Sequence, residues 1–373
     1  MIQIPFYSLE PKSENVRTLL ETTAQSVVAS RNYILGERLA AFESEFAAYL
    51  GSNYFLGVGN GLDAIEIALR TANVGLGDEV IVPGFTFHAT WLAVAKVGAT
   101  PIPVDVDLET GCINVSAVLN AISSTTKAIV PVHLFGGAAN VDAISTAIEG
   151  TGIALIEDCA QAHGAKIGSQ HVGTFGDFGA FSFYPTKNLG AYGDGGGIAT
   201  NSTDSARFIE SFRSYGKGES KYEHKILGTN SRLDELQAAI LSVKLTALED
   251  DNLFRKKIAS RYLDALGDKS NAVINFNRKD ESVWHHFVIN STNRDKIRDV
   301  LSGFGVATDI HYPYSFGSVP ALTQYMTPYS MPNAVNLSKS VLSLPIGPWM
   351  AEHQYEYVSE IIGLPQVKNL LKG

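Results

Sequence analysis

The sequence contains little cysteine and no excess of basic residues. Its two cysteines, Cys112 and Cys159, stand among 373 residues. They can form at most one bridge, which excludes a disulfide framework, so we expect a reduced protein in the cytoplasm. Acidic residues outnumber basic ones by 38 to 29, giving a net charge of −9. Because phosphate neutralisation needs clustered Lys and Arg, this balance counts against a nucleic-acid-binding protein.

Long apolar runs are also missing. None approaches the roughly 18 residues that a membrane-spanning helix needs, so no membrane association is expected. The first residues, MIQIPFYSLEPK, lack the basic stretch and following apolar stretch of a signal peptide. By contrast, 45% of the residues are hydrophobic and only 18% are charged, which favours a large folded core. The chain's 34 glycines often flank short apolar runs, a pattern typical of α/β proteins with tight strand-to-helix turns.

The order of the apolar runs predicts the architecture. Two helices are expected between residues 14 and 50, with a break at Tyr33 to Gly36. Short strands then alternate with helical stretches, which predicts a mixed, mainly parallel sheet flanked by helices. The predicted strands are 54–58, 79–83, 100–104, 127–132 and 153–158, and the predicted helices are 62–71, 88–96, 115–121 and 141–149.

The later part of the chain changes character. Two further strands, 177–184 and 196–201, are expected on either side of a glycine-rich loop, followed by helices over 233–247 and 252–266. A strand at 283–289, a helix at 294–304 and a Tyr- and Pro-rich stretch at 310–332 then indicate a smaller α+β domain. We therefore predict a large α/β domain over 1–248 and a small C-terminal domain over 249–373.

A glycine-rich turn, Gly57-Val-Gly-Asn-Gly-Leu-Asp, separates a predicted strand from a helix. A dinucleotide fingerprint needs a third glycine at position 62, but Leu62 stands there, which argues against a non-catalytic dinucleotide- or sugar-binding module. Two interpretations remain open for Gly61 and Leu62. In the first, their backbone N–H groups bind a phosphate at the helix N-terminus. In the second, the segment is an ordinary strand-to-helix turn.

Two other motifs follow apolar strands. Asp158 and Gln161 lie in Glu157-Asp-Cys-Ala-Gln-Ala-His, at a strand end where ligands of open α/β sheets bind, although Asp158 as a simple helix cap is an alternative. Lys187 lies in Phe181-Ser-Phe-Tyr-Pro-Thr-Lys-Asn, before GDGGG. A lysine there is either a solvated charge or a desolvated nucleophile with a lowered pKa. The hydroxyl of Ser182 is placed to donate to a phosphate.

Together the three segments indicate one cofactor. Pyridoxal 5′-phosphate needs a lysine for its Schiff base, an acid for its ring nitrogen and a cup for its phosphate. Asp158 precedes Lys187 by 29 residues, at the end of the preceding core strand. No set of residues suggests a resident metal ion.

The chain resembles the sugar aminotransferases of the DegT/DnrJ/EryC family, which have the fold-type I architecture of pyridoxal phosphate enzymes. The resemblance covers essentially the whole chain. Its motifs are GNGLDA, PGFTFHAT, PVHLFG, EDCAQAHGA, FSFYPTKNLGAYGDGG and GTNSRLDELQAAIL. Some relatives are dehydratases with histidine at the lysine position, so Lys187 favours transamination.

The resemblance implies a role for each matching residue. Lys187 carries the cofactor and moves the proton, and Asp158 pairs with the ring nitrogen. Gln161 lies near the phenolic oxygen, and Phe87 stacks on the ring, although packing in the core is an alternative for this aromatic residue. The phosphate contacts are Gly61, Leu62, Ser182 and, from the neighbouring subunit of a homodimer with shared active sites, Asn230.

The resemblance also implies the reaction. L-Glutamate donates its amino group, leaves as 2-oxoglutarate, and the pyridoxamine phosphate form aminates a nucleotide-linked keto sugar. The LGAYGDGGG segment and the stretch from Lys221 to Asn230 are similar to enzymes that aminate C3 of dTDP-3-keto-6-deoxyhexoses. A 4-keto nucleotide sugar, a UDP-3-keto-uronic acid and a cyclitol remain alternatives. Candidate substrate contacts, each with packing or a surface position as the alternative, are Tyr33, Tyr184, Arg213, Tyr222, His311 and Tyr312.

Overall fold

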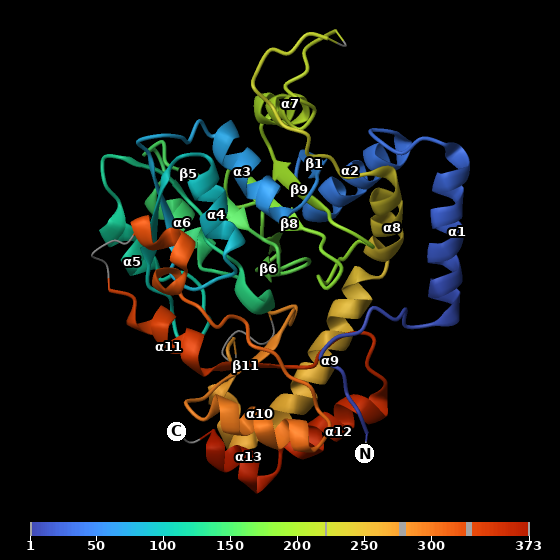
Figure 1. Cartoon of the computed structure of the whole chain (residues 1–373), viewed down its shortest axis with the longest axis vertical. Coiled ribbons are helices and arrows are strands. Elements are labelled where there is room, and N and C mark those ends of the chain that lie inside the picture. Colours follow the sequence, from blue (N-terminus) through green and yellow to red (C-terminus); the bar gives the residue numbers. More distant parts are fainter. Residues whose placement is uncertain (1, 221, 276–280, 326–329, 372–373) are drawn as a thin grey trace.

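The computed structural model describes residues 2–220, 222–275, 281–325 and 330–371. Figure 1 shows a large part built around a sheet, with a smaller helical part below it and both chain ends beside the smaller part. The long helix α9 (Leu248–Leu266) runs from the large part into the small one. In the described residues, no helix combines the length and the apolar character that crossing a membrane requires.

The central sheet has seven strands in the order β1-β9-β8-β5-β4-β2-β3. Only β9 runs antiparallel to its neighbours, so the prediction of a mixed, mainly parallel sheet is confirmed. Its strands are almost wholly apolar because helices cover both faces. The strands are β1 (Tyr54–Val58), β2 (Glu79–Pro83), β3 (Thr100–Val104), β4 (Thr126–Ile129), β5 (Ala154–Asp158), β8 (Phe178–Ser182) and β9 (Gly196–Thr200).

Helices α3, α4 and α7 pack on one face of the sheet, around a core that includes Trp91 and Ile209. On the other face, α2 and α8 enclose an aromatic core around Phe46 and Phe183, and α5 and α6 enclose an aliphatic one. The helices of the large part are α1 (Glu14–Ser30), α2 (Glu37–Leu50), α3 (Gly61–Thr71), α4 (Ala89–Lys96), α5 (Val115–Ala121), α6 (Val141–Ala147), α7 (Thr203–Phe212) and α8 (Glu235–Leu245). A short hairpin of β6 (Lys166–Ile167) and β7 (Gln170–His171) precedes β8.

The break between α1 and α2 is held by one buried carboxylate. Glu235 accepts hydrogen bonds from the backbone N–H groups of Gly36, Arg38 and Leu39 at 2.9–3.0 Å. These donors open α2, where a helix has no partners of its own for its N–H groups. A side chain on Gly36 would collide with Asn32 and with the Glu235 carboxylate itself.

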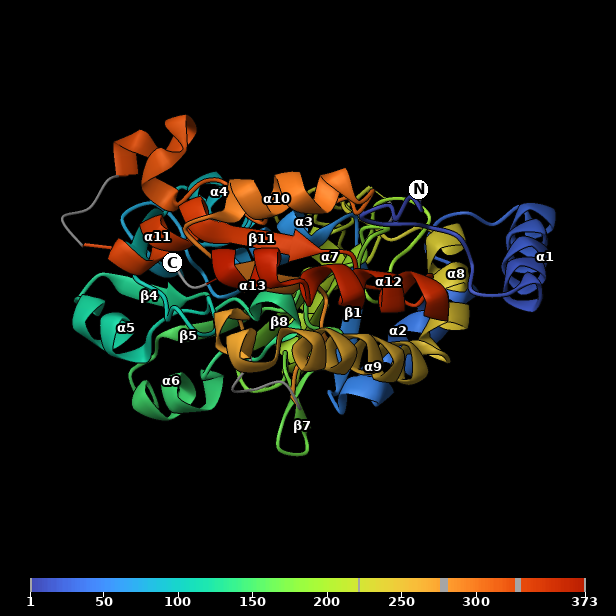
Figure 2. The same ribbon diagram turned by 90° about the horizontal axis from the view of Figure 1, so that it is seen from below.

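The small part has its own core, formed where α9 packs on a two-stranded sheet and on α12. Ile4 from the N-terminal segment is buried in this core and pairs with Val306, so the first residues join the small part. Figure 2 shows α10 and α12 on either side of β11, seen from below. The elements are β10 (Phe287–Asn290), α10 (Arg294–Gly303), α11 (Pro332–Ser340), β11 (Val341–Leu344), α12 (Glu352–Ile362) and α13 (Pro365–Leu370).

The predicted boundaries differ most at the start of the small part. Helix α9 begins four residues earlier than expected, at Leu248, and β10 begins at Phe287 instead of Val283. Residues before Phe287 do not extend the strand because Trp284 has a positive φ of 48° and its carbonyl accepts a hydrogen bond from Arg255. Within the predicted Tyr- and Pro-rich stretch, residues 326–329 lie outside the described residues.

Candidate active site

The carboxyl ends of several strands open into a cavity of about 600 Å³ between the two parts of the chain. Turns after β1, β2, β5 and β8 line its floor, which is where an open α/β sheet binds ligands. The small part and the N-terminal segment line its other walls. Sequence reasoning identified ten of the lining residues as candidates: Gly61, Leu62, Phe87, Asp158, Gln161, Ser182, Tyr184, Lys187, His311 and Tyr312.

Asp158, the last residue of β5, is 5% exposed and lies at the cavity floor. Its carboxylate accepts hydrogen bonds from the Thr90 hydroxyl at 2.8 Å and from the Ala160 N–H at 3.1 Å. Burial raises the pKa of Asp158, while these two hydrogen bonds and the positive charge of Lys187 oppose the rise. A second cation at the floor would be favoured, since a buried carboxylate gains most from a nearby positive charge.

Lys187 follows β8 and faces the same cavity. Desolvation lowers its pKa to about 8, against an opposing effect of Asp158. A pKa this low gives the amine a substantial neutral fraction near neutral pH, which a nucleophile and proton carrier requires. Of the two interpretations of Lys187, the structure therefore favours the desolvated amine over the solvated charge.

The turn before α3 and the end of β8 form a small cradle. A Cβ on Gly61 would lie 2.6 Å from the Cβ of Ser182, so only glycine permits this approach. Asn60 caps the helix by accepting from the Asp63 N–H at 2.9 Å, which leaves the N–H groups of Gly61 and Leu62 without helix partners. These donors and the Ser182 hydroxyl converge as an anion site would require.

Gln161 and Tyr312 form a fixed pair in the cavity wall. The Gln161 side-chain oxygen accepts from the Phe135 N–H at 2.8 Å, which orients the amide so that its nitrogen donates to the Tyr312 hydroxyl at 2.6 Å. Phe87 lies 5.5 Å from the Tyr312 ring and keeps 45% of its surface exposed. An aromatic ring exposed in a cavity is available to stack on a planar ligand, so core packing does not account for Phe87.

Other lining residues were missed by sequence reasoning. Thr90 belongs to the quoted PGFTFHAT motif, but nothing in that motif shows that its hydroxyl meets Asp158. Asp194 likewise lies in a quoted motif, FSFYPTKNLGAYGDGG. Others come from distant segments that the fold brings to the cavity: Phe6, Tyr7, His285, His286 and Asp309.

Four predicted site residues, Tyr33, Arg213, Tyr222 and Asn230, lie outside this cavity. Tyr33 is exposed and donates a hydrogen bond to the Val28 carbonyl, and Tyr222 is 83% exposed. Asn230 is exposed and pairs with Ser214 at the base of the loop that protrudes beyond α7 in Figure 1. Lys221, at the start of the segment compared with C3-aminating enzymes, lies outside the described residues.

The prediction that Arg213 contacts the substrate is wrong, because Arg213 does not line this cavity. Its side chain is 4% exposed, and it donates to the Glu43 carboxylate at 2.5 Å and to the Gly57 carbonyl at 2.6 Å. The guanidinium therefore links α2 to β1 and is not available to a ligand.

His133, Glu157 and Cys159 lie close enough together to resemble a metal site, but their hydrogen bonds indicate a structural role. Glu157 accepts from three backbone N–H groups in residues 173–176, at 2.7–2.9 Å. His133 accepts from the Ala139 N–H through Nδ1, so its Nε2 carries the proton and donates to Glu157 at 3.0 Å. The lone pairs that a metal ion would need are already used.

The residues of the cavity fit pyridoxal phosphate. The cradle made by Gly61, Leu62 and Ser182 suits its phosphate, the buried Asp158 suits a protonated ring nitrogen, and Lys187 is the amine that its aldehyde needs. Together with the sheet order, this arrangement is that of the fold-type I aminotransferases.

The comparisons with known proteins agree. The model of the DegT/DnrJ/EryC1/StrS aminotransferase family matches residues 16–363, and the chain belongs to that family. It is 40% identical over 354 residues to dTDP-3-amino-3,4,6-trideoxy-alpha-D-glucose transaminase of Streptomyces venezuelae, covering 94% of this chain and 93% of that protein. It is also 40% identical to dTDP-3-amino-3,6-dideoxy-alpha-D-galactopyranose transaminase of Aneurinibacillus thermoaerophilus, with 96% and 98% covered.

A third relative, 35% identical with 93% and 96% covered, is UDP-2-acetamido-2-deoxy-3-oxo-D-glucuronate aminotransferase of Pseudomonas aeruginosa. Among solved structures, S. venezuelae DesV in complex with a ketimine intermediate superposes with a TM-score of 0.91 at 38% identity, covering 97% and 98% of the two chains. A Bacillus subtilis structure with bound cofactor PMP also gives 0.91, at 29% identity and with 100% and 86% covered. The predicted family and fold class are confirmed.

Proposed function

We propose that the protein is a pyridoxal-phosphate-dependent aminotransferase that transfers the amino group of L-glutamate to C3 of a dTDP-3-keto-6-deoxyhexose. The products are 2-oxoglutarate and a dTDP-3-amino-3,6-dideoxyhexose. The observation that carries the proposal is the desolvated Lys187 beside the buried Asp158, at the strand ends that also hold the phosphate cradle.

When bound, the cofactor supplies an aldehyde for the amino group and a ring that accepts the electrons of the substrate carbon. Asp158 holds a proton on the ring nitrogen, and Thr90 and the Ala160 N–H fix the direction of its carboxylate. Gln161 directs its amide nitrogen into the cavity because its oxygen is bound to the Phe135 N–H. Phe87 covers one face of the ring and excludes water there.

Lys187 is the base of the reaction. Its amine takes the proton from the α-carbon of the amino donor, and it returns a proton to C3 of the sugar in the second half-reaction. The lowered pKa suits both directions, because an amine near its pKa both accepts and releases a proton readily. Release of one product before the second substrate binds predicts ping-pong kinetics.

The sugar substrate is supported by the two relatives that carry dTDP-3-amino sugars in their names. The cavity offers flat aromatic faces with hydroxyl groups in Tyr184 and Tyr312, and His311 and Asp309 as polar groups for sugar hydroxyls. The relative from P. aeruginosa favours a UDP-3-keto-uronic acid as the second candidate.

We also infer a homodimer with shared active sites, located in the cytoplasm. Support for the shared site comes from Asn230, which lies on an exposed loop and not in the cavity of its own chain. In that position its side chain would contact the phosphate in the active site of a neighbouring subunit.

The first test is the absorption spectrum of the purified protein. It should show the yellow band of a lysine-bound cofactor, and borohydride should abolish that band. Incubation with L-glutamate and a panel of dTDP- and UDP-linked 3-keto and 4-keto sugars, with the aminated carbon read by NMR, then tests the substrate. A Lys187→Ala protein that still forms the reducible adduct would contradict the lysine assignment.

A further inference from the structure

A second cavity, of about 170 Å³, reaches Lys187 from the side of the N-terminal segment. Tyr7 and Lys187 line both cavities, so the two cavities adjoin at these residues. Tyr7 is held there by a hydrogen bond from its hydroxyl to the Pro185 carbonyl at 2.9 Å.

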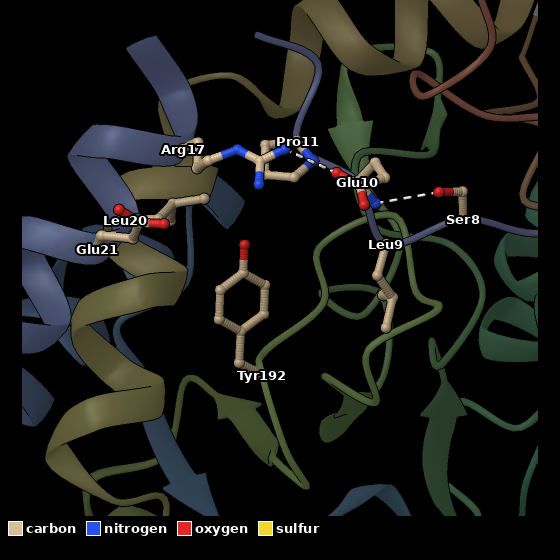
Figure 3. Close-up of a pocket in the computed structure, with 8 residues that line it drawn as sticks. All are labelled: Ser8, Leu9, Glu10, Pro11, Arg17, Leu20, Glu21 and Tyr192. Carbon is tan, nitrogen blue, oxygen red and sulfur yellow. Dashed lines mark hydrogen bonds and ion pairs between the residues drawn. The ribbon is translucent and has the colours of Figure 1, made fainter. Parts of the chain in front are cut away.

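The outer end of this cavity continues into an open hollow that shares Ser8, Leu9 and Tyr192 with it. Figure 3 shows Glu10 and Arg17 paired across the hollow, with the Tyr192 hydroxyl pointing into the space between α1 and the N-terminal segment. The second cavity therefore borders both this hollow and Lys187.

Arg255 is the unusual group in the wall of the second cavity. It lies on α9 and is 3% exposed. Through Nη1 alone it donates to the carbonyls of Trp284, His285 and Ile346 at 3.1–3.4 Å. Its Nε and Nη2 donate no hydrogen bond, and no carboxylate lies within 4.0 Å, among the residues that the structure describes.

The charges around the cavity are not balanced. Its two carboxylates, Glu10 and Asp251, are already paired, with Arg17 and Lys12. Lys244 makes no ion pair in the described part of the chain and donates instead to the Gly190 carbonyl at 2.7 Å. Since a buried cation without a counter-ion is costly, a cavity lined by Arg255 and Lys244 favours an anionic ligand.

We propose that this cavity binds the amino donor and that Arg255 binds one of its carboxylates through Nη2 and Nε. A 2-amino dicarboxylic acid suits the site best, because it brings two negative charges to a cavity in which two cations, Arg255 and Lys244, have no ion pair among the described residues. The sugar then occupies the larger cavity on the other side of Lys187. This inference rests on the proposed function, and it assigns the donor a contact that Arg213 cannot make.

The test uses glutarate, a dicarboxylate that binds but cannot react, with the protein loaded with pyridoxal phosphate. Calorimetry should show binding to the wild-type protein and a loss of affinity of about tenfold or more in Arg255→Gln, since each hydrogen bond to a charged group contributes strongly. Arg261→Gln, on the same helix in an exposed pair with Glu356, is the matched control and should bind like wild type. Equal affinity in Arg255→Gln and Arg261→Gln would overturn the inference.

Because Arg255 also holds three carbonyls, Arg255→Gln could fail to fold. A crystal structure of the wild-type holoprotein with glutarate decides the matter independently. The inference holds if a carboxylate lies within hydrogen-bonding distance of Arg255, and it fails if glutarate binds elsewhere. Neither measurement uses a sugar. Weakened glutarate binding without amination of any keto sugar would refute the proposed function alone, whereas amination with unchanged binding would refute only the role of Arg255.

Discussion

Asn188 donates a hydrogen bond from Nδ2 to the Oδ1 of Asn252 at 2.8 Å, so the residue next to Lys187 is anchored to α9. Its second amide hydrogen goes to the Val283 carbonyl at 3.0 Å. Its oxygen therefore accepts from His285 Nδ1 at 3.0 Å, which fixes this histidine with its proton on Nδ1. Burial lowers the pKa of His285 well below its usual value, so it stays neutral. One side chain thus joins the lysine loop to both parts of the chain.

Replacing Asn188 by Ala should lower the free energy of unfolding by about 2–4 kcal/mol, because three polar partners lose their hydrogen bonds inside the protein. Urea titration followed by circular dichroism measures the change. The exposed Asn120 on α5 provides the control, and Asn120→Ala should stay within about 0.5 kcal/mol of wild type. Equal stabilities for the two variants would show that the anchor contributes little.

The lowered pKa of Lys187 predicts how its reactivity depends on pH. Only the neutral amine is nucleophilic, so acetylation of Lys187 in the cofactor-free protein should increase as pH rises, with a midpoint near 8. An ordinary lysine reaches its midpoint near 10.5. Peptide mass spectrometry after competitive acetylation measures both in one sample, with an added short lysine-containing peptide as the internal reference. A common midpoint for Lys187 and the peptide lysine would contradict the desolvated amine.

Asp158→Asn keeps the shape of the side chain but removes the charge that holds a proton on the ring nitrogen. Turnover should fall by about 100-fold or more, while the yellow, borohydride-sensitive band remains because Lys187 is intact. The exposed Asp204→Asn is the control and should keep full activity. Normal turnover in Asp158→Asn would contradict the role of Asp158 in keeping the ring nitrogen protonated.

The shared site predicts complementation between two inactive proteins. Lys187→Ala chains mixed with Asn230→Ala chains should regain activity, since each mixed dimer then has one site with both residues intact. Assay after subunit exchange, with exchange followed by mass spectrometry of a tagged chain, measures the effect. Mixing two preparations of Lys187→Ala is the control. If both single variants are impaired and their mixed dimers form but remain inactive, Asn230 does not act in the active site of the neighbouring subunit.

Much of the large part could be predicted because its signals are local. Each strand is a short apolar run, and the stretch 115–121 was predicted with its bounds as observed in α5. Two helices begin earlier than predicted: α3 begins at Gly61 instead of residue 62, and α9 begins at Leu248 instead of residue 252. The starts differ because capping and packing determine where a helix begins. Asp158, Lys187 and the turn at Gly61 could be found because each follows an apolar strand whose end faces the cavity.

The remainder of the site depends on contacts between distant parts of the sequence. Arg213 has no local sign that it pairs with Glu43, 170 residues earlier, and its position near a helix end suggested a free charge. Likewise, the sequence around Arg255 shows only one of several charged residues on a long helix. Its burial results from the packing of distant segments and cannot be predicted locally. His285 and His286 were interpreted as part of a strand, but two hydrogen bonds hold this segment out of the sheet: Arg255 donates to the His285 carbonyl, and His285 Nδ1 donates to Asn188.

The pairing of Ile4 with Val306 has a practical consequence for work with this protein. Residues 4–12 run from the core of the small part past Tyr7 and along one wall of the second cavity. Removing them to aid crystallisation would therefore open that cavity and expose part of the core of the small part at the same time.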